Sequence, residues 1–240
     1  MKHFNMKRLS MKSLRFVPLL ALILMISAGE ARAAGAGKIV VAPLSGTVSV
    51  QMEQFVGKTI TRAELDRASL IIFRLDTPGG LVEATRGITQ AILASRVPVV
   101  MWVPPGGRAA SAGAFMMQAA HVAAMSPGTN IGAAHPVIAS GKDVPAGDMK
   151  TKVTNDLMAQ MRSLTQLRGR NEDVAQQMIQ ESLSLTAREA LRENVVDLVV
   201  DDLEALILAT SGRIAIVDGR PLKIELLPGA IENVEMTGQE

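Results

Sequence analysis

The chain has 240 residues, of which 48% are hydrophobic and 20% are charged, and this is enough apolar material for one sizeable core. It contains no cysteine, which excludes disulfides, thiolate catalysis and cysteine-based zinc sites. Six of its 25 basic residues but only one of its 23 acidic residues lie within residues 1–33, so the rest of the chain is net acidic and no nucleic-acid partner is expected.

The first 33 residues have the pattern of a secretory signal peptide. Basic residues lead into an apolar run from Phe16 to Ala28, and Ala31-Arg32-Ala33 then supplies small residues at the spacing of a cleavage site. The run is short for a bilayer span and contains Pro18. We therefore predict a signal peptide over residues 1–33 and export to the periplasm or another extracytoplasmic space, with an uncleaved signal that anchors the protein to the membrane as the alternative.

Strands and helices alternate over the next hundred residues. Around a Ser45-Gly46 turn the sequence predicts two strands, Lys38–Leu44 and Thr47–Val50, followed by a short helix that is capped by Thr61 and ends at Arg67. The predicted elements that follow are the strand Leu70–Leu75, the helix Leu81–Ser95, the strand Val97–Val103, the helix Ser111–Ala120 and the strand His121–Met125. This order predicts βαβ units and a parallel sheet.

The second half of the chain begins with an irregular segment, Gly132–Gly147, which is predicted to be a surface loop suited to gating a substrate site. The elements predicted after it are the helices Thr151–Arg168, Glu172–Gln180 and Thr186–Glu193, the strand Val195–Val200, and a terminal hairpin of Ile214–Val217 with Leu222–Leu226. The last dozen residues are expected to fray.

Two glycine-containing turns follow predicted buried strands and form a candidate functional site. Asp76-Thr77-Pro78-Gly79-Gly80 is either an ordinary strand-to-helix turn or an anion cradle formed by N–H groups at the start of a helix. The other turn contains Ser111, which is either a helix cap or a nucleophile among small neighbours. It fits neither the G-x-S-x-G nor the S-x-x-K motif, and its spacing alone leaves both interpretations open.

A nucleophilic serine needs a base, and four side chains are candidates. His121 begins an apolar strand and is expected to be a satisfied core residue, whereas His135 lies in a loop able to reach the site. Lys150 and Lys152 flank the start of a helix, and a lysine base must be desolvated so that its pKa falls. Helical periodicity does not choose between them, because Lys150 shares a face with Leu157 and Lys152 lies on its flank. No metal-ligand motif is present, and neither metal nor cofactor is expected.

Motifs that resemble a known family occur in a fixed order. They are Leu75–Leu81, Arg108–Gly113, Pro127–Pro136 and Lys152–Asn155, with a further match at Ser184–Leu191. Together they resemble the protease domain of NfeD-type membrane-bound serine proteases, within the ClpP/crotonase-like superfamily, and the likeness covers residues 38–208. The resemblance implies an α/β fold, a single-domain ClpP/crotonase-like spiral of βαβ units over residues 34–210, followed by a hairpin and tail over residues 211–240.

The resemblance also implies a Ser–Lys dyad. Carried over motif by motif, Ser111 is the nucleophile and Lys152 the base. Gly80 and Ala112 are the implied N–H donors of the oxyanion hole, in a turn that Gly79 shapes and completes. His135 falls near the position of the ClpP base histidine and is the alternative base.

The function implied is that of a serine endopeptidase acting on apolar or membrane-associated proteins, a stomatin-like protein among them, on the exported side of the membrane. A homo-oligomer, most simply a dimer, is expected. Longer family members carry further transmembrane helices and a small β-barrel domain, neither of which is expected within these residues. The alternatives are a non-catalytic interaction module with the ClpP fold and a crotonase-like acyl-CoA enzyme.

Overall fold

A parallel sheet organises the computed structural model, which describes residues 37–137, 145–226 and 230–236. These residues belong to one unit, Gly35–Glu240. The sheet has the strand order β11-β1-β2-β3-β5-β8, and every neighbouring pair is parallel. Its strands are β1 (Ile39–Ser45), β2 (Leu70–Asp76), β3 (Val99–Val103), β5 (Val122–Met125), β8 (Leu198–Val199) and β11 (Ile231–Asn233).

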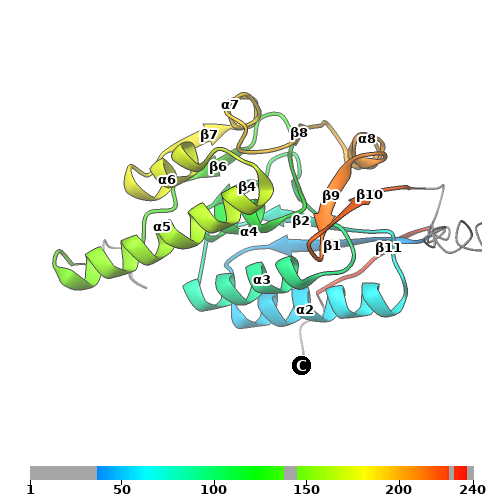
Figure 1. Cartoon of the computed structure of the whole chain (residues 1–240), viewed down its shortest axis with the longest axis horizontal. Coiled ribbons are helices and arrows are strands. Elements are labelled where there is room, and N and C mark those ends of the chain that lie inside the picture. Colours follow the sequence, from blue (N-terminus) through cyan, green and yellow to red (C-terminus); the bar gives the residue numbers. More distant parts are fainter. Residues whose placement is uncertain (1–36, 138–144, 227–229, 237–240) are drawn as a thin grey trace, which may run out of the picture. The chain divides into compact units, whose positions relative to one another are not determined.

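Both faces of this sheet are apolar, as is usual for parallel strands covered on two sides. In β1, Val40 and Ala42 belong to the core shared with α2 (Val50–Leu65) and α3 (Val82–Ala94). Ile39 and Val41 belong to a second core on the opposite face. Figure 1 shows α2 and α3 on one side of the sheet. On the other side lie α8 (Leu203–Thr210) and a hairpin of β9 (Ile214–Val217) and β10 (Arg220–Lys223).

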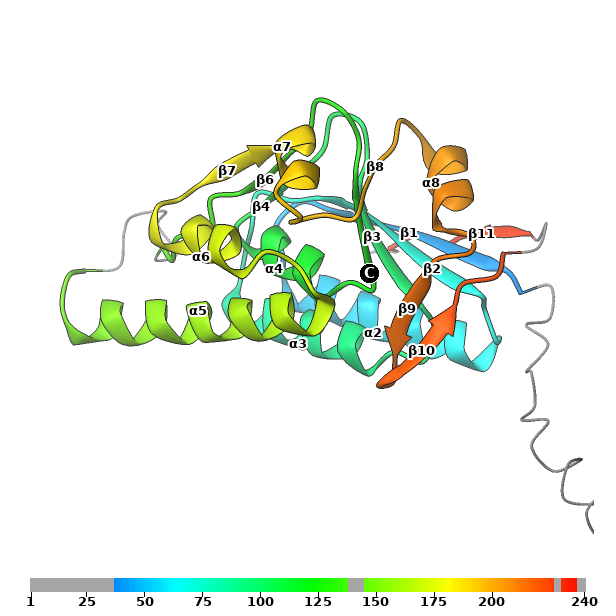
Figure 2. The same ribbon diagram turned by 45° about the horizontal axis from the view of Figure 1, so that its top comes forward.

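A smaller sheet lies at the carboxyl ends of the parallel strands, where α/β proteins commonly bind ligands. It consists of β4 (Arg108–Ala110), which follows β3, β6 (Asn130–Gly132), which follows β5, and β7 (Ser184–Thr186). The remaining helices are α4 (Ala112–Ala119), α5 (Asp148–Arg168), α6 (Glu172–Gln180) and α7 (Ala187–Arg192). Both views place this sheet with α5, α6 and α7 at one end of the molecule's parallel sheet (Figures 1 and 2).

Most of the predicted elements are confirmed. The α/β class, the parallel sheet and the boundaries of α6 agree with the sequence prediction. The predicted capping box also forms, because Thr186 Oγ1 accepts the Glu189 N–H while the Glu189 carboxylate accepts the Thr186 N–H.

The segment after β1 was predicted wrongly. Thr47–Val50 is no strand, and the helix does not start near Thr61; α2 begins at Val50, and its cap is Ser49, whose Oγ accepts the Met52 N–H at 3.3 Å. The β-branched residues and Gly57 lower the helix propensity of this segment. Burial of one face against the sheet outweighs that propensity; the buried residues are Met52, Val56, Thr59, Ile60 and Ala63.

The predicted frayed tail is also wrong in part. β11 pairs in parallel with β1, with Ile39 opposite Ile231, and Val234 donates its N–H to the Val41 carbonyl at 2.9 Å. The sequence prediction also missed β4, β6 and β7, each of three residues, and the helix α8.

Two predicted features fall outside the described residues. These are the signal peptide over residues 1–33 and residues 138–144 of the predicted loop Gly132–Gly147. Within the residues that the structure describes, no helix combines the length and the apolar character needed to cross a bilayer.

Candidate active site

Ser111 occupies a strained turn between β4 and α4. Its φ of 52° and ψ of −112° lie in a region that non-glycine residues rarely adopt, at a cost of roughly 1–3 kcal/mol. The turn is held from both sides, since the Ser111 N–H donates to the Gly132 carbonyl (2.9 Å) and the Ser111 carbonyl accepts the Ala114 N–H (3.0 Å). Such strain persists only where the surrounding structure enforces it.

The Ser111 hydroxyl does not act as a helix cap. Although Ser111 stands at the cap position of α4, its side chain accepts no hydrogen bond from that helix. Helix capping therefore does not explain the serine at this position. Its hydroxyl lies at the positive end of the helix and is available for another role.

Gly79 lies directly against Ser111. A Cβ at Gly79 would be 2.6 Å from Ser111 Cβ, and the φ of +116° at Gly79 also favours glycine. The Gly79 N–H donates to Thr77 Oγ1 at 3.1 Å, so this donor is engaged within the turn. The absence of a side chain at Gly79 therefore allows its turn and the Ser111 turn to approach each other.

Gly80 and Ala112 lie beside Ser111 in the lining of the same pocket. A Cβ at Gly80 would be 2.2 Å from the Val48 carbonyl oxygen, so only glycine fits there. Among the described residues, neither the Gly80 N–H nor the Ala112 N–H donates to a protein acceptor. Two such donors beside a hydroxyl are the arrangement needed to stabilise an oxyanion.

These groups line one pocket with a cavity volume of about 60 Å³. Its polar members are Ser111, His135, Thr85 and Gln160, and its walls are otherwise apolar. The full lining is Gly80, Val82, Thr85, Ser111, Ala112, Phe115, Ala134, His135, Pro136, Val137, Leu157 and Gln160. The structure thus places Ser111, Gly80, Ala112 and His135 around one pocket.

His135 is half-buried and oriented by the backbone. Its Nδ1 lies 3.0 Å from the Ile179 carbonyl oxygen, which can only accept, so Nδ1 carries the proton. In the neutral ring Nε2 is then an unprotonated acceptor, which is the form that a general base requires.

Lys152 is on α5 but does not line the pocket. Its side chain is exposed, whereas Lys150 is half-buried, and the same helix contributes Leu157 and Gln160 to the pocket wall. With 3.6 residues per turn, Lys150 shares the face of Leu157 and Lys152 points aside. Of the two predicted dyad residues, the pocket lining thus includes Ser111 but not Lys152.

Two residues that support the turn were not identified from the sequence. Thr77, fully buried, holds Gly79, and Gly132 accepts the Ser111 N–H while a Cβ there would be 2.2 Å from the Leu183 carbonyl oxygen. The sequence indicated these two residues only by their positions within the motifs Asp76–Gly80 and Asn130–Gly132. Within the described part of the chain no three His, Asp or Glu side chains gather as a potential metal site.

Comparison with known proteins gives consistent matches. The model of the family described as "NfeD1b, N-terminal domain" matches residues 38–211. The "Membrane-bound protease PH1510" of Pyrococcus horikoshii is 38% identical over 175 residues, which are 72% of this chain and 40% of that relative. This chain therefore spans less than half the length of that curated relative.

Solved structures agree in fold. A serine-to-alanine variant of the 1510-N membrane-bound stomatin-specific protease superposes with a TM-score of 0.77 at 34% identity, covering 82% of this chain and 97% of that one. A lysine-to-alanine variant of the same protease, in complex with a substrate peptide, gives 0.76 at 34% identity, covering 85% and 93%. The predicted α/β fold class is confirmed by these matches.

Proposed function

This chain belongs to the family of NfeD1b N-terminal domains, and on that premise we propose that it is a serine endopeptidase with Ser111 as its nucleophile. The observation that carries the proposal is the strained Ser111 turn, whose hydroxyl caps no helix while Gly80 and Ala112 line the same pocket. A nucleophile beside preorganised donors is the minimum apparatus for acyl transfer.

Lys152 is the base that we propose. The serine and the lysine that were replaced in the two solved variants of the relative are separated by the same number of residues as Ser111 and Lys152. The lysine variant was solved with a substrate peptide, which fits the loss of a group that acts after binding. Because Lys152 is exposed and outside the pocket lining here, the proposal requires its side chain to reach toward Ser111 when a peptide occupies the pocket.

His135 is the alternative base, favoured by one specific observation. It lines the pocket together with Ser111, and its Nδ1 is held by a carbonyl so that Nε2 is free of a proton in the neutral ring. The two hypotheses differ in geometry, since the histidine is already at the site and the lysine must approach it.

The proposed reaction has two halves. Ser111 Oγ attacks the peptide carbonyl carbon while its proton passes to the neutral base, and the carbonyl oxygen, now negative, accepts hydrogen bonds from Gly80 and Ala112. The base then protonates the leaving amine as the C–N bond breaks, which leaves an ester between Ser111 and the acyl group. Water, deprotonated by the same base, hydrolyses that ester and restores Ser111.

The substrate class follows from the walls of the pocket. Val82, Phe115, Pro136, Val137 and Leu157 form an apolar lining, which suits an apolar side chain beside the scissile bond. The relative is described as membrane-bound and specific for a stomatin homologue. We therefore propose apolar or membrane-associated proteins, including a stomatin-like one, as substrates.

The proposed organisation and location rest on the sequence. Residues 1–33 are a signal peptide or membrane anchor, residues 34–210 are the protease domain, and residues 211–240 are a C-terminal hairpin and tail. The protein acts on the exported side of the membrane, as a homo-oligomer whose simplest form is a dimer. Light scattering at micromolar concentration, with only a monomer detected, would contradict the last point.

Covalent labelling tests the proposal. A fluorophosphonate should label Ser111 and stop peptide cleavage, and Ser111→Ala should take up no label. A crotonase-like acyl-CoA enzyme or a non-catalytic interaction module would show no labelled Ser111, and that result in a folded protein would overturn the proposal.

A further inference from the structure

A second pocket lies on the other side of the parallel sheet from α2 and α3, between the start of β5, the end of α5 and β9. Its volume is about 140 Å³, well above the roughly 10–15 Å³ that one water molecule needs. Its lining includes His121, Arg168, Asp197 and Arg213 and is more polar than the lining of the Ser111 pocket. None of these residues belongs to the proposed catalytic site.

His121 brings a buried donor to this pocket. Its Nδ1 accepts the Val99 N–H at 3.1 Å, so in the neutral ring the proton is on Nε2. Burial lowers the pKa of His121 from 6.5 to about 3, with further lowering by Arg168 and Arg170, which keeps the ring neutral near pH 7. The His121 side chain is buried, with the residue only 8% exposed, and its Nε2–H finds no acceptor among the described residues.

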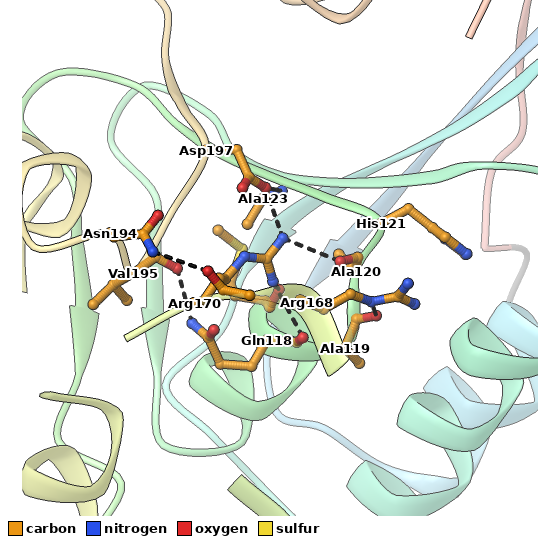
Figure 3. A network of polar contacts seen from close by, with 12 residues as sticks. Gln118, Ala119, Ala120, His121, Ala123, Arg168, Arg170, Asn194, Val195 and Asp197 are labelled. Atoms are coloured by element: carbon orange, nitrogen blue, oxygen red, sulfur yellow. Dashed lines mark hydrogen bonds and ion pairs between the residues drawn. The ribbon is translucent and has the colours of Figure 1, made fainter. Parts of the chain in front are cut away.

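Arg168 brings a second such donor. Its Nε donates to the Ala119 carbonyl (2.9 Å) and its Nη1 to the Ile216 carbonyl (3.0 Å), while Nη2 is buried with no acceptor among the described residues. Burial and Arg170 lower the pKa of Arg168 to about 10, so its positive charge is poorly compensated. Figure 3 shows the Arg168 guanidinium and the His121 ring extending to the same side, away from Arg170.

The nearby Asp197 carboxylate already has hydrogen-bond and ion-pair partners. Arg170, whose side chain is 1% exposed, binds Asp197 Oδ2 at 2.7 Å, and the same oxygen accepts the Ala123 N–H at 2.7 Å (Figure 3). Among the described residues, neither Arg168 nor Arg213 has a carboxylate within ion-pair distance. The pocket therefore has two guanidinium groups without an ion-pair partner among the described residues, and two buried donors that lack acceptors there.

We propose that this pocket binds a phosphate-class oxyanion, held by His121 Nε2–H, Arg168 Nη2 and the guanidinium of Arg213. A tetrahedral oxyanion offers several acceptor atoms in different directions, and a dianion matches two cations. Leu167, Ile214 and Ile216 also line the pocket, and they are 53%, 71% and 44% exposed. This rim admits a phosphate that carries an apolar chain, so a lipid headgroup and free phosphate are the two sources of the same chemistry.

Calorimetric titration of the full chain with inorganic phosphate, at constant ionic strength, tests the proposal. Saturable binding at one site is expected, and Arg168→Gln and Arg213→Gln should each weaken it at least about tenfold. Arg188→Gln removes the same charge from the exposed α7 and should leave the affinity unchanged. Because Arg168 also binds two backbone carbonyls, Arg213→Gln decides the outcome if Arg168→Gln does not fold.

His121→Asn refines the test, because an amide oxygen can still accept the Val99 N–H while the Nε2–H is lost. A several-fold weaker phosphate affinity is expected. Absence of saturable phosphate binding, or an equal loss in Arg188→Gln and Arg213→Gln, would overturn the proposal and assign the buried donors to water.

Vesicle flotation distinguishes the two sources. Binding to phosphatidic acid vesicles but not to phosphatidylcholine vesicles, lost in Arg213→Gln and reversed by inorganic phosphate, would identify a headgroup as the occupant. Saturable phosphate binding without flotation would identify the free ion, and either result supports the site.

Discussion

The two pockets use unsatisfied N–H donors of different kinds. In the Ser111 pocket the donors are backbone groups of Gly80 and Ala112, which are neutral and fixed by their turns. In the second pocket they belong to side chains, and Arg168 carries a full charge. Neutral donors suit a negative charge that exists only during a reaction, whereas permanent cations suit a ligand that is always an anion.

The surroundings of the two pockets also differ. The first is built on local strain at Ser111 and on close backbone contacts at glycines, with apolar walls. The second adjoins a buried network in which Arg170 binds three carbonyls and Asp197 (Figure 3). We therefore expect changes in the first pocket to affect turnover and changes around the second to affect stability.

Ser111→Ala should have the largest effect. Without the nucleophile, peptide cleavage should fall by roughly 10³-fold or more, while the melting temperature stays close to that of the unchanged protein. Cleavage assays and thermal denaturation on the same preparations measure both. A purified Ser111→Ala protein with undiminished cleavage would end the assignment.

Replacing the base should have the next largest effect and should decide between the two candidates. We expect Lys152→Ala to abolish cleavage, and Lys152→Arg too, because arginine cannot release its proton at a working pH. Lys150→Ala and His135→Ala should retain much of the activity. Near-normal turnover in Lys152→Ala together with loss in His135→Ala would establish the histidine.

Asp197→Ala should lower the free energy of unfolding by about 3–5 kcal/mol, because it leaves the buried Arg170 guanidinium without its carboxylate. Denaturant titration measures this value. The matched control is Asp156→Ala, which removes an exposed ion pair with Arg86 and should change stability by less than about 1 kcal/mol. Equal losses of unfolding free energy in the two variants would show that the buried Arg170–Asp197 pair stabilises the protein no more than the exposed Arg86–Asp156 pair does.

The last expected effect is absent near neutral pH and develops only in acid, where His121 should make stability depend on pH. The unfolded chain protonates this side chain near pH 6.5, but burial lowers the pKa in the folded protein to about 3. Stability should therefore be complete above about pH 6.5 and decline as the pH falls toward 3, by at most about 1.4 kcal/mol per pH unit. His121→Asn should flatten the curve of unfolding free energy against pH in this window, and an unchanged slope would contradict the assignment.

Long periodic or apolar segments were predictable from the sequence, and so were the residues of the Ser111 turn. The apolar run of β2 and the helical spacing of apolar residues in α3 can be read within each segment, and the motif at Gly79-Gly80 marked the turn that contacts Ser111. The strand predicted at Thr47–Val50 failed although local propensity favours one, because Val48 forms only an isolated bridge with Gly80 and Ser49 already caps α2.

The remaining features depend on contacts between distant segments. β6 and β7 are three residues each and depend on pairing between distant segments, β7 with β6 and β6 with β4. Arg168 and Arg170 stand at an ordinary helix end around Gly169, and nothing in that segment indicates their burial against the chain near His121 and Asp197. The exposed position of Lys152 follows from the rotation of α5, which residue spacing alone did not fix.

The strands after α8 determine where a recombinant fragment can end. The family match stops at residue 211, but Ala215, Val217 and Ile224 pack into the core on one face of the sheet and β11 covers the outer edge of β1. A fragment ending at 211 would expose apolar side chains such as Val41, Ile72 and Trp102 to water and leave an unpaired strand edge. Exposed edges and apolar faces drive aggregation, so a well-behaved fragment must extend at least to Val234.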